Sequence, residues 1–219
     1  MKDAIQVSKE NYLKAILEAE AEGHQVIPAT LAHWLEVSAP AVTMALKRLR
    51  RDGYVEITDG IVRLTQSGKE TAYRTALRHH LIERMLKEIF GMQWYEIHDE
   101  AERLEHAVSP AFEEKLKEKL GEGGACPHGN AVLPERPAER KKRGEVPLSE
   151  AKAGERYRVT SLQERDSQLL LFLHGMGIGP DKTLKVVSQN YDQTVSIELS
   201  TGNSILGRPA AEAVWLRLE

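Results

Sequence analysis

The chain has 219 residues, a formal net charge of −3 and 41% hydrophobic residues, a composition that fits one large domain or two to three small ones. It holds no run of about 18 apolar residues, the length needed to cross a bilayer. Residues 1–12 lack the basic and then apolar pattern of a secretory signal. With Cys126 as its single cysteine, the sequence excludes an internal disulfide. These features predict a cytoplasmic protein.

Residues 9–64 show the order helix, short helix, turn, helix and hairpin. Ser8 is placed to cap the first helix, which Gly23 ends. Ser38 is placed to cap the third helix, whose first turn accepts a proline. Asp59-Gly60, between two short apolar segments, is a two-residue hairpin signal. This order is typical of a winged helix-turn-helix.

A local basic stripe accompanies this pattern, because residues 41–75 carry seven cationic and four anionic side chains. The second helix of such a pair lies in the major groove, with its first residues at base edges. We expect base-edge contacts from Ser38, Ala39, Pro40, Thr43 and Met44, and phosphate contacts from Arg48, Arg50 and Arg51. The alternative is a helical hairpin with an exposed turn and no ligand.

Two further helices, separated by a break at Gly91, carry imidazole and carboxylate groups at helical spacing. His79 and Glu83 lie four residues apart on the first helix and share a face. On the second, an arc of roughly 100° holds four more such residues: His98, Glu102, Glu105 and His106. These are ligand types for Mn²⁺, Fe²⁺, Co²⁺ and Zn²⁺. The alternative is a solvated charged face.

Residues 121–149 have the proline, glycine and charge content of a linker, after a short amphipathic helix at 111–120. Within this stretch we interpret Cys126 and His128 as incidental members of a turn, because no second pair with zinc-finger spacing exists. From Gly154 the apolar period becomes two, which predicts five short strands in an SH3-like barrel. Its glycines do not match a phosphate-binding loop.

The order of these parts resembles the diphtheria toxin repressor family, whose members are metal-activated bacterial transcription factors. The resemblance rests on HHLIER at 79–84, HDEAERLEH at 98–106 and CPHGN at 126–130. It implies a mainly α fold with small β parts. The implied divisions are a winged helix-turn-helix domain (1–74), a helical metal-binding and dimerisation domain (75–126), a proline-rich linker (127–149) and an SH3-like domain (150–219).

The resemblance also implies two metal sites. The ancillary set is His79, Glu83 and His98, with Glu164 of the SH3-like domain as a further oxygen ligand. The primary set is Glu102, Glu105 and His106, with Asn11 of the first helix. Iron-type relatives place cysteine at the position of Glu102, so its carboxylate favours manganese. Lys14 lies where manganese-type relatives supply another carboxylate, which argues against a closely paired two-manganese centre.

The implied function is a homodimeric, Mn²⁺- or Fe²⁺-activated repressor of metal-uptake genes, with manganese favoured. It would bind double-stranded operator DNA, bind neither an organic cofactor nor a membrane, and have no enzymatic activity. The expected dimer face is Leu104, Ala107, Val108 and Phe112. Three alternatives remain: an iron-responsive member, a metal-dependent hydrolase, which needs an open cleft and a base, and a winged-helix regulator with an organic inducer.

Overall fold

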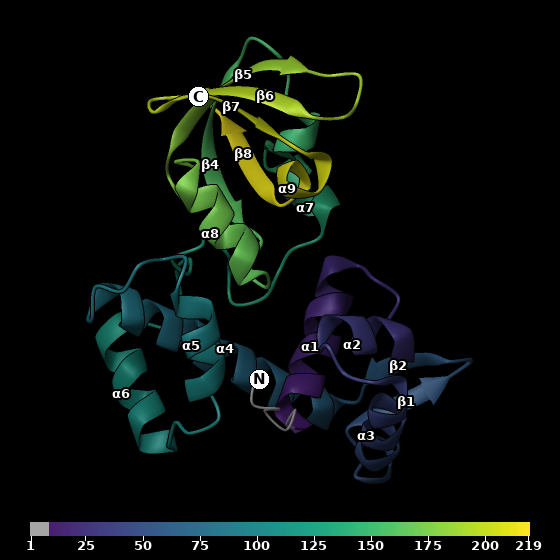
Figure 1. The fold of residues 1–219 in the computed structure, drawn as a ribbon. Helices are drawn as coiled ribbons and strands as arrows, with labels where there is room; N and C mark the ends of the chain where they lie inside the picture. The colour runs from purple at the N-terminus through teal and green to yellow at the C-terminus, as the bar shows by residue number, and fades with distance from the viewer. Residues whose placement is uncertain (1–8) are drawn as a thin grey trace.

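The computed structural model describes residues 9–219, so the expected cap at Ser8 lies outside the described residues. Figure 1 shows three units: a helical unit with a hairpin at the N-terminal side, a second helical unit, and a β-rich unit formed by the C-terminal residues. The long helix α4 (Gln66–Glu88) joins the first two units. Among the described helices, none has the length and apolar content to span a membrane.

The first unit is a winged helix-turn-helix, as predicted. It consists of α1 (Lys9–Glu22), α2 (Pro28–Trp34), α3 (Ala39–Arg51), β1 (Val55–Thr58) and β2 (Ile61–Leu64). Ser38 caps α3, its Oγ accepting from the backbone N–H of Ala41 at 3.4 Å. Asp59 and Gly60 have φ of 51° and 78°, the left-handed pair that a tight hairpin turn requires. Buried aliphatic residues from all three helices and both strands form its core.

The second unit packs α5 (Ile97–Leu104) and α6 (Pro110–Leu120) against α4. The sequence predicts a helix over residues 71–90, but α4 begins at Gln66 because Thr65 caps it, accepting from the N–H of Gly68 at 3.1 Å. α5 is shorter than expected and ends at Leu104. Glu105 and His106 therefore follow its last residue, and Glu105 keeps helical dihedral angles, φ −56° and ψ −29°, with its N–H bonded to the Ala101 carbonyl.

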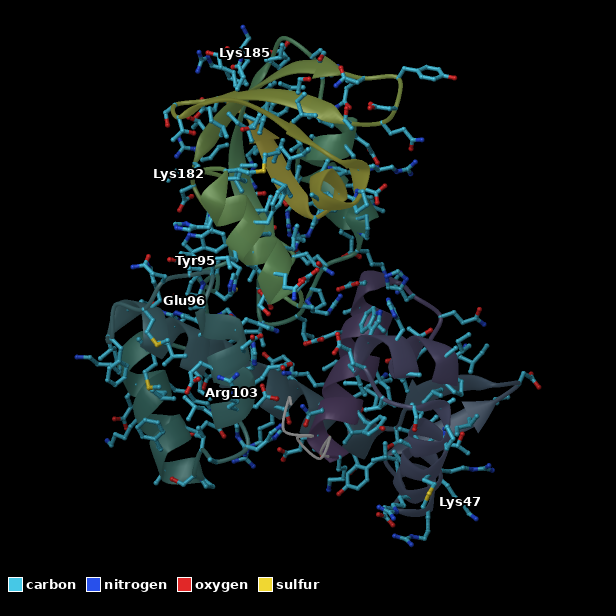
Figure 2. The ribbon with its side chains drawn as sticks, viewed as in Figure 1. Lys47, Tyr95, Glu96, Arg103, Lys182 and Lys185 are labelled. Atoms are coloured by element: carbon cyan, nitrogen blue, oxygen red, sulfur yellow. The ribbon has the colours of Figure 1, made fainter. Side chains whose placement is uncertain are left out.

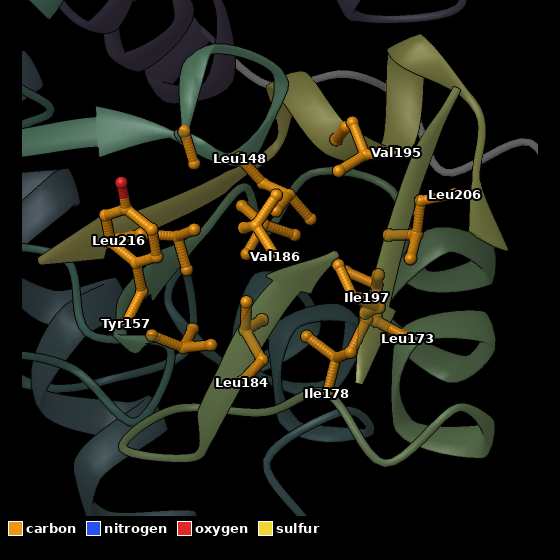
Figure 3. Close-up of a cluster of buried hydrophobic side chains, with 14 of the residues drawn as sticks. Leu148, Tyr157, Leu173, Ile178, Leu184, Val186, Val195, Ile197, Leu206 and Leu216 are labelled. Carbon is orange, nitrogen blue, oxygen red and sulfur yellow. The ribbon is translucent and has the colours of Figure 1, made fainter. Parts of the chain in front are cut away.

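The third unit is a six-stranded antiparallel sheet in the order β3-β8-β4-β5-β6-β7. Its elements are α7 (Pro137–Lys142), β3 (Glu145–Pro147), η1 (Leu148–Glu150), β4 (Arg156–Leu162), α8 (Ser167–Gly175), β5 (Thr183–Gln189), β6 (Val195–Leu199), β7 (Gly202–Leu206), α9 (Arg208–Glu212) and β8 (Val214–Leu218). Leu184, Val186, Ile197 and Leu216 fill its core (Figure 3). The sixth strand, β3, and helix α7 come from the stretch whose composition indicated a linker.

The β-rich unit contacts both helical units. Tyr95, before α5, stacks on His174 of α8 with ring centroids 3.9 Å apart, and Figure 2 shows Tyr95 at the boundary between these two units. Arg165, before α8, lies over the Trp34 ring at 4.1 Å and pairs with Glu22 of α1. The β4–α8 loop, which contains Glu164, is therefore positioned by contacts on two sides.

Candidate metal centre

The first donor cluster forms where α4 meets α5. His79 and Glu83, one turn apart on α4, place Nε2 and Oε1 3.0 Å from each other. His98, in the first turn of α5, brings its Nδ1 to 3.1 Å from both atoms. All three side chains are buried. The structure thus brings together the three residues expected for the ancillary site.

Glu164 and the turn at residues 126–130 complete this cluster from the other side. His128 Nδ1 lies 3.5 Å from Glu83 Oε1 and 3.4 Å from Glu164 Oε2. Cys126 Sγ lies 3.4 Å from Glu164 Oε2 and 3.7 Å from His128 Nδ1. The interpretation of Cys126 and His128 as incidental turn residues therefore differs from the structure, in which both are buried beside a candidate ligand set.

Two sets of donor atoms converge to within 4.8 Å of one another in the described part of the chain. One is His79, Glu83, His98 and Glu164, and the other is Glu83, Cys126, His128 and Glu164. Within residues 9–219, Glu83 Oε2 and His128 Nε2 are buried without a hydrogen-bond partner. Buried polar atoms normally have partners. This chemistry fits a divalent cation.

Electrostatics show how the cluster balances its charge. Burial would lower the pKa of His79, but Glu83 and Glu105 outweigh burial and raise that pKa to about 10. Burial would likewise lower the pKa of His128, yet Glu164 and Glu83 raise it to about 10. Burial and the same two carboxylates raise the pKa of the Cys126 thiol well above its usual value. The histidines therefore carry the positive charge that compensates the carboxylates.

The residues expected for the primary site surround an ammonium group instead. Lys14 Nζ, buried on α1, donates to both carboxylate oxygens of Glu105 at 2.9 and 2.8 Å. It also lies 3.4 Å from His79 Nδ1 and 3.9 Å from Glu102 Oε1. Burial would lower the pKa of Lys14, but Glu105 and the other nearby carboxylates raise it. In this arrangement the set does not fit a metal ion, because a fixed cation already contacts its central carboxylate.

The other expected primary ligands differ in exposure and in their contacts. Glu102 is 47% exposed at its side chain. His106 Nδ1 lies 2.7 Å from Glu10 Oε2, so Glu10 brings a carboxylate of the first helix to this point. Sequence reasoning missed Glu10, although it lies four residues before Lys14 and therefore shares its helix face. Glu10, His106, Glu105 and Lys14 form a continuous polar network between α1 and the end of α5.

The predicted DNA-contacting side chains lie on one exposed surface of α3. Ser38, Ala39, Pro40, Thr43, Met44, Arg48, Arg50 and Arg51 are all exposed. A shallow pocket is lined by Met44, Lys47, Arg48 and Arg51, and Figure 2 shows Lys47 at the end of the unit far from Tyr95. Thr43 Oγ1 donates its hydrogen to the Ala39 carbonyl at 3.0 Å. The oxygen lone pairs and the methyl group of this exposed side chain are left for contacts with DNA. Arg51 is tied to Asp52 at 2.8 Å.

The expected dimer face is only partly available. Phe112 is 45% exposed and Ala107 is exposed. Leu104 and Val108, by contrast, pack in part against the core of their own unit, together with Leu116.

Comparison with known proteins matches three domain families along the chain. Residues 5–59 match the iron-dependent repressor N-terminal DNA-binding domain. Residues 65–134 match the iron-dependent repressor metal-binding and dimerisation domain, and residues 146–218 match the FeoA domain. These families account for all three structural units. The first two are domains of iron-dependent repressors, so the comparisons place the chain among transcriptional repressors and not among enzymes.

Relatives agree with this assignment. The diphtheria toxin repressor of Corynebacterium glutamicum is 37% identical over 133 residues, 60% of this chain and 58% of that protein. The iron-dependent repressor IdeR of Mycobacterium tuberculosis is 35% identical over 124 residues, 56% of this chain and 54% of that protein. The matched region thus spans less than two thirds of these relatives' length.

Solved structures extend the similarity over the whole chain. A manganese-dependent transcriptional repressor in complex with manganese is 31% identical, with a TM-score of 0.80 over 97% of this chain and 100% of that one. ScaR with bound Zn²⁺ is 28% identical, with a TM-score of 0.78 over 96% and 99%. The chain belongs to the diphtheria toxin repressor family of iron-dependent repressors.

Proposed function

We propose that this chain is a metal-activated, homodimeric repressor that binds operator DNA upstream of metal-uptake genes. The observation that carries the proposal is the convergence of His79, Glu83, His98 and Glu164 beside the winged helix. These four donors come from α4, α5 and the β4–α8 loop, so one ion would join all three. A bound Mn²⁺ or Fe²⁺ would supply the positive charge that lets the buried Glu83 and the partly exposed Glu164 carboxylates remain close.

His79 connects this cluster to the DNA-binding unit. Its Nε2 faces Glu83, while its Nδ1 lies 2.7 Å from Glu105 Oε2. A ligand imidazole is typically oriented by such a carboxylate at its other nitrogen. Glu105 in turn holds Lys14 of α1, the helix that packs against α4 and α3. A change at the cluster therefore biases the position of α1 and, through it, the recognition helix α3.

Manganese is our proposed activator. The donor set of His79, Glu83, His98 and Glu164 contains two imidazoles and two carboxylates, which suit Mn²⁺ and Fe²⁺ alike. Glu102, where iron-type relatives have cysteine, adds an oxygen rather than a sulfur near Lys14. A solved repressor with similar overall structure is described with manganese. Raw affinity runs in the order Mn²⁺ below Fe²⁺, so selectivity must come from geometry.

Selection of DNA from a genomic library, under anaerobic conditions with Mn²⁺, Fe²⁺ or a chelator, tests this proposal. We expect Mn²⁺ to enrich specific fragments upstream of metal-transport genes. Glu83→Gln should remove the metal dependence. The matched control Glu88→Gln changes an exposed glutamate on the same helix that pairs with Arg84 and should leave it intact. Sequence-specific binding that ignores both metals would overturn the proposal.

A further inference from the structure

A buried arginine lies in the β-rich unit, outside the donor cluster. Arg140, on the short helix α7 (Figure 1), is only 7% exposed. Its Nη1 donates to Ser161 Oγ, and its Nη2 donates to Asn130 Oδ1 at 3.1 Å. The guanidinium lies over the Trp215 ring, 4.9 Å from its centroid. Both hydrogen-bond acceptors are neutral, although burying a charge is costly. A cation at this place therefore calls for a role beyond packing.

The hydrogen bond from Arg140 fixes the direction in which the Asn130 amide faces. A guanidinium has N–H donors and no acceptor, so the oxygen of the amide must face it. The amide nitrogen then donates to the Leu162 carbonyl at 2.8 Å and to Glu164 Oε2 at 2.7 Å. Both of its hydrogens are thereby used. If the amide were turned over, its oxygen would face two other oxygens and its nitrogen would face the guanidinium.

The amide of Asn130 holds one carboxylate oxygen of Glu164. The same Oε2 atom lies 3.4 Å from both Cys126 Sγ and His128 Nδ1. The Glu164 side chain is 25% exposed, so burial alone does not fix its position. A glutamate loses rotamer freedom when it is held in one conformation. The bond from Asn130 orders this side chain before any ion binds.

We propose that Arg140 is a positioning residue for the metal ligand Glu164 and acts through the side-chain amide of Asn130. The inference rests on the proposed function, in which Glu164 is one of the ligands. The positive charge has a reason in this arrangement, because a cation bound at the amide oxygen polarises the amide and strengthens its N–H donation to the carboxylate. Hydrogen-bonding partners of metal ligands typically change metal affinity by about 10–100-fold.

Ser161 provides the matched control, because it accepts the other hydrogen bond of Arg140. Anaerobic titration with Mn²⁺, followed by electron paramagnetic resonance, measures the affinity of each variant. Arg140→Met and Asn130→Ala should each weaken Mn²⁺ binding about tenfold. The double variant should be no weaker than Asn130→Ala alone, because both changes remove the same connection. Ser161→Ala disturbs the attachment of α7 but keeps the contact with Asn130, so its affinity should stay within about twofold of wild type.

Circular dichroism in the presence of a chelator checks that each variant folds. A second measurement needs no variant: in the metal-free wild type, nuclear magnetic resonance should show the side-chain amide protons of Asn130 exchanging about tenfold more slowly than those of the exposed Asn203. Exchange at the rate of Asn203 would overturn the inference.

Three outcomes of the Mn²⁺ titration would also overturn the positioning role. They are an unchanged affinity in Arg140→Met, an equal loss in Arg140→Met and Ser161→Ala, and additive losses in the double variant. An equal loss would assign Arg140 to the attachment of α7 alone, and additive losses would separate it from Asn130. Failure of the DNA selection with Mn²⁺ would affect only the proposed repressor function, because Mn²⁺ binding is measured here without DNA.

Discussion

The ammonium of Lys14 contacts both carboxylate oxygens of Glu105 at 2.8–2.9 Å, in a place where Glu105 has no exposed surface. The pair joins α1 to the residue that follows α5. A positive charge therefore already lies at the carboxylate that the family resemblance assigned to an activating metal. In this chain the side-chain ammonium of Lys14 connects α1 to the end of α5.

Replacement of Lys14 by Met is expected to destabilise the metal-free protein by about 3–5 kcal/mol, because Glu105 would remain buried with one compensating partner fewer. Urea unfolding in the presence of a chelator measures this change. Lys9→Met is the control, since Lys9 is exposed over the Tyr54 ring, and it should cost no more than about 1 kcal/mol.

The same variant should gain a metal ion. With the ammonium removed, Glu105 and its neighbours Glu102 and His106 can accept one. Electron paramagnetic resonance should therefore count one more Mn²⁺ per chain in Lys14→Met than in wild type. An unchanged count would show that Lys14 is not what excludes metal from these residues.

Metal binding should release protons. The pKa values of His79 and His128 are raised to about 10, so both rings are charged in the metal-free protein near neutral pH. A ligand imidazole must be neutral, and Mn²⁺ affinity should therefore rise by up to about tenfold per pH unit for each proton released. Calorimetry in buffers of different ionisation enthalpy should report at least one proton. A buffer-independent heat would contradict the prediction.

These histidines also give the metal-free protein a defined pH dependence. Because their folded pKa lies above the ordinary value of 6.5, their stabilising contribution is complete below that pH and is lost as the pH rises through about 10. Urea unfolding in chelator between pH 6 and 10 should show falling stability. His79→Gln should reduce this change of unfolding free energy with pH. If the variant keeps the full pH dependence, other groups cause it.

DNA contacts should differ between two adjacent arginines. Arg50→Ala should lower the slope of log affinity against log salt by about one unit, on specific and random DNA alike. Arg51→Ala should have a smaller effect, because its Nε is engaged by Asp52 at 2.8 Å. Fluorescence anisotropy at four salt concentrations measures both. Equal slopes for the two variants would show that DNA binding breaks the Arg51–Asp52 pair.

Thr43→Ala should change sequence preference rather than salt dependence. Its hydroxyl hydrogen is used by the Ala39 carbonyl, which leaves an acceptor and a methyl group, suited to a base amino group or a thymine methyl. Competition among single-base operator variants measures the preference. A uniform loss across all sequences would argue against a base-edge contact.

Dimerisation should depend on the exposed ring of Phe112. Phe112→Asp places a charge on the expected dimer face and should shift sedimentation towards the monomer. Leu171→Asp is the control, since Leu171 is 58% exposed on α8 of the β-rich unit. If only Leu171→Asp dissociated the dimer, the dimer face would lie on the β-rich unit.

Local signals in the sequence predicted the winged helix well. Ser38 caps α3 and Asp59-Gly60 makes the hairpin because each acts through neighbours within a few residues. Helical spacing likewise placed His79 and Glu83 together on α4. The start of α4 was missed because its cap, Thr65, precedes the region of clear apolar periodicity.

Tertiary relationships were less accessible from the sequence. Lys14 occurs as an ordinary helical lysine, and its burial depends on Glu105, which is distant in the chain. Glu10 and Asn11 are adjacent, and periodicity alone does not say that the Glu10 carboxylate reaches His106. Cys126 and His128 form a single short motif, and their chemistry becomes apparent only when Glu83 and Glu164 arrive from other units.

The β4–α8 loop places two consecutive residues against different partners. Glu164 joins the donor cluster, whereas Arg165 pairs with Glu22 and covers Trp34 in the winged-helix unit. The single peptide bond between Glu164 and Arg165 thus fixes the distance between the donor cluster and the contact with the winged-helix unit. Evolution can exchange side chains elsewhere in this loop more freely than it can change the loop's length. A single residue inserted between the two positions would preserve both chemistries and still uncouple them.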